Sequence, residues 1–296
     1  MKTEPPARRQ KIFTRRRFVQ LIGGGLAGIA AGGWHSLLFA PTNPLVTEEE
    51  VWLKNLPRAF DGLRVAQLSD LHFSEIVSKE YLEKCVRLTN ALEPDLILLT
   101  GDYVTALEGE SRTVTTERYV EPLSEILAPL KAKLAKFAVF GNHDITVNPK
   151  AVQRAIEAAG IHFLRDEGVA LRRGGERLPV VGLADFDTQV VNQKRAFSSI
   201  DPDEPTLILM HNPDLFGVGM EHKNGLIFSG HLHGGQVCFP FVGPLYIPSR
   251  FGAKYLSGRF EKGDLCMLVN RGIGVIHFRI RVNCRPEITL VTLRSA

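Results

Sequence analysis

The chain has 296 residues, of which 44% are hydrophobic, and a formal net charge of +4. This length can bury one large core or two modest ones. Seven basic residues and one acid lie within the first 17 residues, so the charge of the remainder falls from +4 to −2 once their +6 is removed. The basic balance therefore belongs to the N-terminus alone, and the mildly acidic body gives no sign of a nucleic-acid partner.

Residues 1–45 are predicted to be an export signal or an N-terminal anchor, followed by a linker. The segment Thr14-Arg15-Arg16-Arg17-Phe18-Val19-Gln20 precedes residues 21–40, which hold no charged side chain. Paired arginines before an apolar stretch resemble the twin-arginine signal. We therefore expect the twin-arginine export machinery as a partner, and a location in the periplasm, in the cell wall or on the outer face of the inner membrane. An uncleaved membrane anchor is the alternative, because about 20 apolar residues can cross a bilayer.

Residues 46–296 are predicted to form one α/β domain, because strand and helix patterns alternate along them. Apolar runs predict buried strands at residues 63–68, 96–99, 137–140, 207–210 and 226–228. Helices are predicted at residues 79–91, 120–134, 149–159 and 190–197. Three short strands are expected between residues 161 and 184, with turns at Glu167-Gly168 and Gly174-Gly175. Residues 288–293 alternate branched and polar side chains as an outer strand would.

Each of the five buried strands is followed by a short polar cluster. In chain order the clusters are Asp70-Leu71-His72, Gly101-Asp102, Gly141-Asn142-His143-Asp144, His211-Asn212 and Gly230-His231-Leu232-His233. Five strand ends that bring Asp, His and Asn to one rim supply what a two-metal hydrolytic centre needs. Taken singly, Asp-x-His or Gly-Asp is a weak signal, and two loop histidines can be an ordinary surface feature. The glycines around the last cluster favour a site, because glycine lets the backbone approach a crowded centre closely.

Together the clusters resemble the signature of the calcineurin-like metallophosphoesterase superfamily: Asp-x-His, Gly-Asp, Gly-Asn-His-Asp/Glu, His and Gly-His-x-His. Leu232 stands where that family commonly has Thr, at a position that is not a ligand. The similarity covers roughly residues 46–296. Further segments resemble a branch of twin-arginine-exported phosphodiesterases of the YkuE/YaeI type, namely Gly234-Gly235-Gln236 and residues 248–252, 270–274 and 284–288.

The resemblance implies both a fold and a metal site. The fold would be a layered β-sandwich flanked by helices, with a dinuclear metal centre at the strand ends. One divalent ion would take Asp70, His72 and His233, and the other Asn142, His211 and His231, with Asp102 bridging the two. Oxygen and nitrogen ligands without cysteine suit Mn, Fe, Zn or Mg. Two such ions about 3.5–4 Å apart can share and acidify a water for in-line attack on phosphorus.

His143 and Asp144 are the expected catalytic side chains. His143 is not needed as a ligand, so it is free to protonate or stabilise the leaving alkoxide. Asp144 is expected to hold that imidazole protonated and correctly oriented. Arg250 and Arg271 are candidates for gripping a substrate phosphate, because guanidinium pairs with phosphate oxygens in bidentate fashion. Each arginine could instead form an ordinary surface ion pair.

The leading interpretation is a metal-dependent phosphodiesterase that acts on a phosphoester outside the cytoplasm, in association with the membrane or cell envelope. A pyrophosphatase for a nucleotide-sugar lipid precursor of the UDP-diacylglucosamine type, or a phosphomonoesterase, would use the same centre. A catalytically silent envelope-binding module is the alternative from another class. Such a module would be expected to have lost a metal-ligand residue or His143, and neither is lost here. The four cysteines fit neither a metal-binding spacing nor a disulfide framework, so buried thiols are expected at Cys85 and Cys266.

Overall fold

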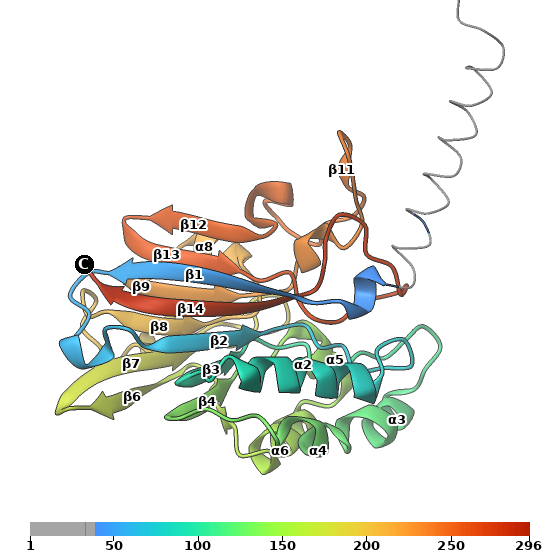
Figure 1. Ribbon diagram of the computed structural model, residues 1–296, viewed down its shortest axis with the longest axis horizontal. Helices are drawn as coiled ribbons and strands as arrows, with labels where there is room; N and C mark the ends of the chain where they lie inside the picture. Colours follow the sequence, from blue (N-terminus) through green and yellow to red (C-terminus); the bar gives the residue numbers. More distant parts are fainter. Residues whose placement is uncertain (1–32, 34–38) are drawn as a thin grey trace, which may run out of the picture.

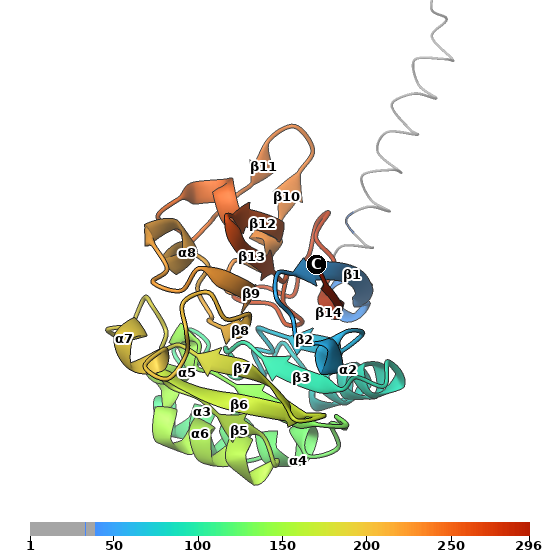
Figure 2. The ribbon, with the colours of Figure 1, turned by 90° about the vertical axis from the view of Figure 1, so that its left-hand side faces the viewer.

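The computed structural model describes residue 33 and residues 39–296. The expected twin-arginine segment and nearly all of the apolar stretch 21–40 lie outside the described residues. Two six-stranded sheets face each other, and helices cover their outer surfaces (Figures 1 and 2). This arrangement confirms the predicted layered α/β fold. No helix within the described ranges is long and apolar enough to span a membrane.

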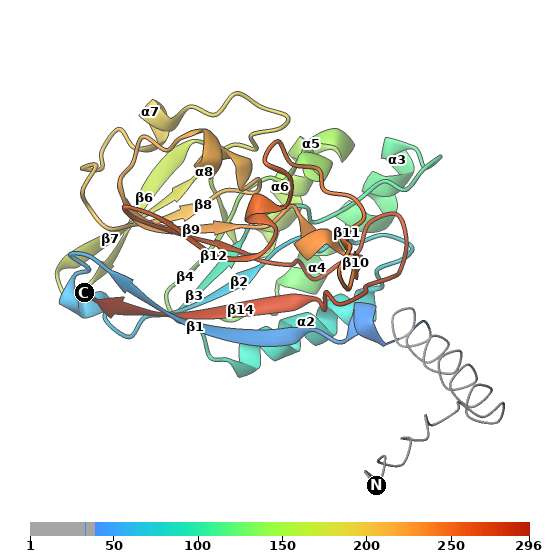
Figure 3. The same cartoon turned by 90° about the horizontal axis from the view of Figure 1, so that it is seen from above.

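The first sheet has the strand order β1-β14-β2-β3-β4-β5. Its strands are Leu45–Leu53 (β1), Glu287–Ser295 (β14), Arg64–Leu68 (β2), Leu96–Leu99 (β3), Ala135–Ala138 (β4) and His162–Phe163 (β5). Strands β2 to β5 are parallel, so their carboxyl ends meet at one edge of the sheet. Strand β1 is an edge strand of this sheet and runs beside β14 (Figure 3).

The second sheet has the strand order β12-β13-β9-β8-β7-β6. Its strands are Gly258–Lys262 (β12), Asp264–Val269 (β13), Asn224–Ser229 (β9), Thr206–Leu209 (β8), Glu176–Gly182 (β7) and Glu167–Arg173 (β6). Strands β7, β8, β9 and β13 are parallel, so this sheet also has one edge of carboxyl ends. A small hairpin of Cys238–Phe239 (β10) and Gly243–Pro244 (β11) projects from the body (Figure 1).

Three apolar clusters hold the layers together. The helices are Lys79–Ala91 (α2), Arg112–Thr115 (α3), Leu123–Leu127 (α4), Asn142–Val147 (α5), Pro149–Ala158 (α6), Gln193–Ala196 (α7) and Asp214–Val218 (α8). Successive side chains of a strand point to opposite faces. Val65 of β2 therefore joins the cluster between the sheets with Leu207 and Phe228, whereas Ala66 joins the cluster beneath α2, α4 and α6. A third cluster packs the outer face of the second sheet against α8 and Tyr255.

The sequence predicted two helices well and two poorly. Helix α2 has the predicted bounds, and α6 begins at Pro149 as expected, with the side chain of Asn148 accepting a hydrogen bond from the Ala151 N–H. The predicted helix 120–134 is wrong, because Pro122 and Pro129 confine α4 to five residues between them. The predicted helix 190–197 is reduced to α7, which begins after Asn192.

Three strand predictions also need correction. The C-terminal strand β14 is not an outer strand, because it lies between β1 and β2 and its first five residues are buried. Strand β4 ends at Ala138, two residues before the predicted run 137–140 ends. The expected turn at Glu167-Gly168 instead begins β6, whereas the turn at Gly174-Gly175 is confirmed between β6 and β7.

Candidate metal centre

The seven predicted ligand residues converge where the two sheets present their carboxyl ends. Asp70 and His72 follow β2, Asp102 follows β3, Asn142 begins α5 after β4, His211 follows β8, and His231 and His233 follow β9. Because parallel strands end on the same side, residues far apart in the sequence become neighbours. The donor atoms of these residues form two groups with all members within 4.8 Å of one another, Asp70-His72-His233 and Asp102-His211-His231, and a third such group joins His72 and Asp102 to His143.

The first group surrounds the imidazole of His72. Its Nε2 lies 3.7 Å from Asp70 Oδ1 and 2.9 Å from His233 Nε2. His233 Nε2 is also 3.3 Å from Asp70 Oδ1. All three residues are almost fully buried. Two imidazole nitrogens this close, both facing one carboxylate, fit a shared cation better than a hydrogen bond between the rings.

The second group is joined to the first by Asp102. Asp102 Oδ2 lies 3.1 Å from His211 Nε2 and 3.6 Å from His72 Nε2, so this carboxylate faces both groups. His231 Nδ1 is 3.2 Å from His211 Nε2. The side-chain oxygen of Asn142 is buried and has no hydrogen-bond partner among the described residues. A buried oxygen of this kind normally has a partner, and a divalent cation would supply one, so the donor set fits two metal ions.

The ligand loops adopt a backbone that non-glycine residues rarely take. Positive φ angles occur at Asp70 (52°), His72 (48°), Asp102 (56°), His231 (73°) and His233 (51°). This left-handed conformation costs on the order of 1 kcal/mol for each such residue. Gly230 is needed beside them, because a Cβ there would collide with Asp70 and Ser69. The fold therefore accepts local strain to point these side chains inward.

The nitrogens that face away from the centre also have partners. His211 Nδ1 lies 2.7 Å from the Thr100 carbonyl oxygen, and His231 Nε2 lies 3.1 Å from the Pro248 carbonyl oxygen. A carbonyl oxygen accepts a hydrogen bond from the ring N–H, so it fixes the tautomer that turns the lone pair of the other nitrogen towards the centre. His231 Nε2 is also 3.3 Å from the Asp187 carboxylate.

Asp144 has a different role from the one expected. Its carboxylate accepts hydrogen bonds from the backbone N–H groups of Asp102 (2.8 Å), Tyr103 (2.8 Å) and Gly141 (2.9 Å). The carboxylate therefore ties the loop after β3 to the start of α5 and faces the backbone rather than the imidazole of His143. The structure contradicts the predicted pairing of Asp144 with His143, because the backbone donors occupy both carboxylate oxygens.

Thr105 holds the position next to His143 that was expected for Asp144. Its Oγ1 lies 3.1 Å from His143 Nδ1 and also contacts His72 Nδ1. If His72 offers its Nε2 lone pair to a metal, its Nδ1–H donates to Thr105 Oγ1. The single hydroxyl proton then goes to His143 Nδ1, which leaves the His143 proton on Nε2. One hydroxyl thus fixes the orientation of both rings.

Burial and charge set the protonation states of the centre. Burial opposes ionisation of Asp102, but the imidazoles of His211 and His143 hold its pKa well below the usual range. His211 is buried too, and the Asp102 carboxylate nevertheless raises its pKa well above normal. Burial lowers the pKa of His143 to about 4. Burial thus opposes the expected protonated form of His143, whereas the nearby Asp102 carboxylate favours it.

The two candidate phosphate-binding arginines differ in their surroundings. Arg250 is exposed, and its guanidinium carbon lies 4.7 Å from the centre of the Phe186 ring. Phe186 directly precedes Asp187 in the sequence. Arg271 is half-buried, with Nε 3.4 Å from Glu287 Oε2. The alternative of an ordinary ion pair thus describes Arg271, whereas Arg250 has a guanidinium that no carboxylate engages among the described residues.

Sequence reasoning missed three residues at the centre. Thr105 and Asp187 both follow strands, β3 and β7, and so carried the same strand-end signal as the ligands, although nothing in their own spacing identified them. Arg281 is fully buried and donates to the carbonyl oxygens of Arg271 (2.9 Å) and Gly272 (3.1 Å). It stabilises the loop whose Gly274 N–H binds the Asp70 carbonyl. The available signal was a pair of arginines, Arg279 and Arg281, within the otherwise uncharged run 273–282.

Comparisons with known proteins agree with this geometry. The chain is 29% identical over 291 residues to the uncharacterized metallophosphoesterase YkuE of Bacillus subtilis, covering 96% of this chain and 99% of that one. It is 28% identical to the phosphodiesterase YaeI of Escherichia coli, covering 95% of this chain and 100% of the relative. It is also 28% identical to the UDP-2,3-diacylglucosamine pyrophosphatase LpxG of Chlamydia trachomatis, covering 80% of this chain and 86% of that one.

A family model described as calcineurin-like phosphoesterase matches residues 63–235, a span that includes all seven predicted ligands. These phosphoesterases use two divalent metal ions, and the two donor groups described above are the residues that would hold them. With more than half of its length matched, the chain belongs to the calcineurin-like phosphoesterase family and is a hydrolase.

Proposed function

We propose that this hydrolase is a phosphodiesterase that cleaves its ester by in-line attack at a two-metal centre. The observation that carries the proposal is the place of Asp102, whose Oδ2 faces His72 on one side and His211 on the other. When bound, two divalent cations would acidify a water and neutralise charge on the phosphoryl oxygens. Asp70, His72 and His233 would hold one, and Asn142, His211 and His231 the other.

The remaining residues act on the substrate. His143 donates a hydrogen bond from Nε2 to the leaving oxygen, because Thr105 occupies its Nδ1. A positioned donor of this kind contributes about 10²–10⁴ in rate. Arg250 is the better candidate for gripping a non-bridging oxygen or a second substrate group, since the guanidinium of Arg271 already faces Glu287. A diester fits this arrangement because it has two ester oxygens. One carries the leaving group, and the other carries a group that remains on phosphorus.

A comparison of two chromogenic esters tests the proposal. Purified protein is assayed with bis-p-nitrophenyl phosphate and p-nitrophenyl phosphate after loading with Mn, Fe, Zn or Mg. We expect kcat/KM for the diester to exceed that for the monoester by at least about tenfold with the best metal. A monoester preference with every metal would overturn the phosphodiesterase assignment in favour of a phosphomonoesterase.

Cleavage of a pyrophosphate bond is the second candidate. LpxG, a relative that covers 80% of the chain, carries the name of a pyrophosphatase for a nucleotide-sugar lipid. The same centre could attack either phosphorus of a pyrophosphate, because the chemistry at each resembles a diester. Release of uridine monophosphate from UDP-diacylglucosamine at a rate above that for the chromogenic diester would favour this candidate.

We further propose that the protein acts outside the cytoplasm after twin-arginine export. The support is the sequence Thr14-Arg15-Arg16-Arg17-Phe18 before an uncharged stretch of 20 residues, 21–40. Replacement of Arg15 and Arg16 by Lys should leave the protein in the cytoplasm, whereas the general secretion route tolerates Lys. Replacement of Arg8 and Arg9 by Lys is the matched control. Unchanged delivery of the Arg15/Arg16 variant in cell fractionation would reject this route.

A further inference from the structure

An apolar groove opens directly from the metal centre. This groove is a cavity of about 370 Å³ formed by residues 231–233, 235–237, 245–246, 248 and 276–278. His231 and His233 line its inner end, and Leu245, Tyr246 and Phe278 line the rest. A substrate whose phosphorus lies at the metals would therefore extend its remaining group along apolar side chains. A polar sugar or nucleotide would find few partners there.

The groove wall is fixed to the ligand loop by Gln236. The Gln236 side chain donates to the carbonyl oxygen of Ile276 (3.0 Å) and accepts from the Ile276 N–H (2.9 Å). Its own backbone carbonyl accepts from the Val282 N–H (3.0 Å). Because Gln236 follows His233 by three residues, the wall and the metal ligands keep a fixed relation. The groove is thus a built extension of the centre.

The hairpin β10–β11 carries the apolar surface beyond the groove. No residue from Val237 to Ser249 is charged. Phe241 at the tip is fully exposed, and Val242 beside it is 74% exposed. Phe241 also has a φ of +66°, a conformation that is strained for a bulky side chain. Phe241 and Val242 together give the tip an exposed apolar patch, and such patches are typical of interaction surfaces.

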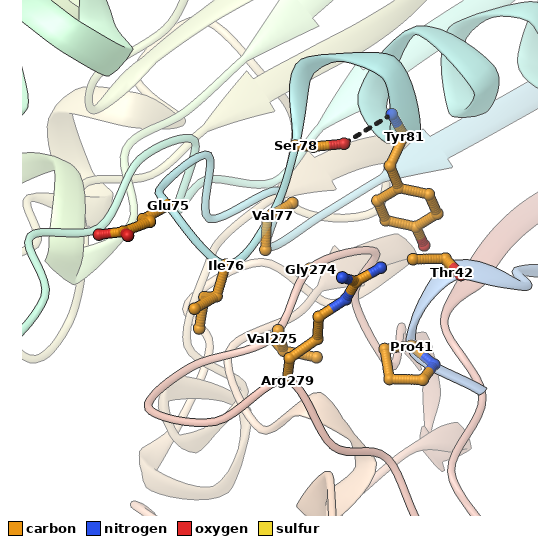
Figure 4. A pocket seen from close by; sticks show the side chains of 10 residues that line it. All are labelled: Pro41, Thr42, Glu75, Ile76, Val77, Ser78, Tyr81, Gly274, Val275 and Arg279. Atoms are coloured by element: carbon orange, nitrogen blue, oxygen red, sulfur yellow. Dashed lines mark hydrogen bonds between the residues drawn. The ribbon is translucent and has the colours of Figure 1, made fainter. Parts of the chain in front are cut away.

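The start of the described chain lies at the same end of the molecule. Pro41 and Thr42 directly follow the uncharged stretch 21–40, and they line a small cavity together with Arg279 (Figure 4). Arg279 follows the exposed Phe278 of the groove wall. An aromatic ring beside an arginine is typical of a protein surface that meets a lipid headgroup layer. Figures 1 and 3 show the hairpin and residues 40–42 at this end.

We propose that the centre acts on amphiphilic phosphoesters presented by a lipid surface. The hairpin tip enters the apolar layer, and the groove receives an acyl chain of the ester while its phosphorus lies at the metals. This inference rests on the proposed hydrolase function and adds the class of substrate. Leu245 and Tyr246 of the groove directly follow the uncharged hairpin in the chain, so one apolar segment supplies both the tip and part of the groove wall.

Chain-length dependence of binding tests the groove. The affinities of methyl-, butyl- and octylphosphonate, which are not hydrolysed, are measured by calorimetry with the metal-loaded full-length protein. Each buried methylene should strengthen binding about fourfold, so butyl, with three more methylenes, should bind about 60-fold more tightly than methyl. The double variant Leu245→Ser/Phe278→Ser should lose at least four-fifths of that difference. Val190→Ser, a change at an exposed residue outside the groove, should retain it.

Quenching by brominated lipid tests the hairpin. Full-length Phe241→Trp and Val190→Trp variants are bound to vesicles of phosphatidylcholine with brominated or ordinary acyl chains. The fluorescence that Phe241→Trp adds to the parent should fall by at least half with brominated lipid, while that of Val190→Trp should not change. Equal behaviour of the two variants would overturn the proposal, and so would equal affinity for all three phosphonates. Neither outcome would affect diester hydrolysis, which tests the proposed function separately.

Discussion

At the scale of single residues, the centre depends on side chains that each serve two neighbours. Asp102 faces both donor groups, and Thr105 contacts both His72 and His143. Asp144 gathers three backbone N–H groups and so holds two ligand loops at once. Loss of any of these residues should therefore affect more than one function of the site.

Asp102→Ala should remove metal from both positions, because this carboxylate is the shared donor. We expect metal content below about 0.3 ions per chain by elemental analysis and loss of diester hydrolysis. Asp187→Ala is the matched control, since its carboxylate lies 3.3 Å from His231 Nε2 on the side away from His211. That variant should keep both ions. Two ions per chain in Asp102→Ala would contradict the bridging assignment.

Thr105→Val should disturb His143 without disturbing the fold, because valine fills the same space but offers no hydroxyl. The tautomer of His143 is read from ¹⁵N chemical shifts, with the proton expected on Nε2 in the parent and shared between both nitrogens in the variant. Activity on an alkyl diester should fall by about 10- to 100-fold. Thr105→Ser keeps the hydroxyl, so it should retain both the parent tautomer of His143 and the activity on the alkyl diester. If the valine variant kept the parent tautomer, Thr105 would not be the residue that fixes the His143 proton on Nε2.

At the scale of elements, the strand ends were predictable and the long-range packing was not. Apolar runs located β2, β3, β8 and β9, because buried parallel strands read as continuous hydrophobic segments. The alternating C-terminal run looked like an outer strand, yet Thr289 is buried and its hydroxyl accepts a hydrogen bond from the side chain of Asn270 (2.8 Å), which follows β13 of the other sheet. Polar atoms that are satisfied by distant partners mimic solvent exposure in a sequence. Thr105 and Arg281 were missed for the same reason.

Helix α2 carries one element-scale prediction. Ser78 caps it by accepting from the Tyr81 N–H at 3.4 Å, and the Tyr81 hydroxyl donates to the Ile273 carbonyl oxygen at 3.0 Å. Ser78→Ala should lower the free energy of unfolding by about 1 kcal/mol. The measurement is urea denaturation of the metal-loaded protein. Ser198→Ala removes an exposed hydroxyl that binds none of the described residues and should change stability by less than about 0.3 kcal/mol.

At the scale of the whole molecule, the metal centre lies where the two sheets meet, so it connects the halves of the fold. Strands β2, β3 and β4 supply one side of the centre and β8 and β9 the other. Burial raises the pKa of the Cys85 thiol to about 12 and that of Cys266 to about 11, so both side chains stay neutral and contribute packing. All four cysteines are free thiols, so no disulfide joins the layers within residues 39–296.

Removal of metal should therefore destabilise the whole fold rather than one loop. Ligands that bind only the native state stabilise it by about 4 kcal/mol when present at 1,000 times Kd, and each of two ions contributes separately. Chelation should lower Tm by on the order of 10 °C, measured by calorimetry. Chelation should lower the Tm of Asp102→Asn by less than that of the parent. The variant binds metal poorly, and it no longer buries a second carboxylate beside Asp70. An equal fall in both proteins would mean that the metals bind elsewhere than between the two sheets.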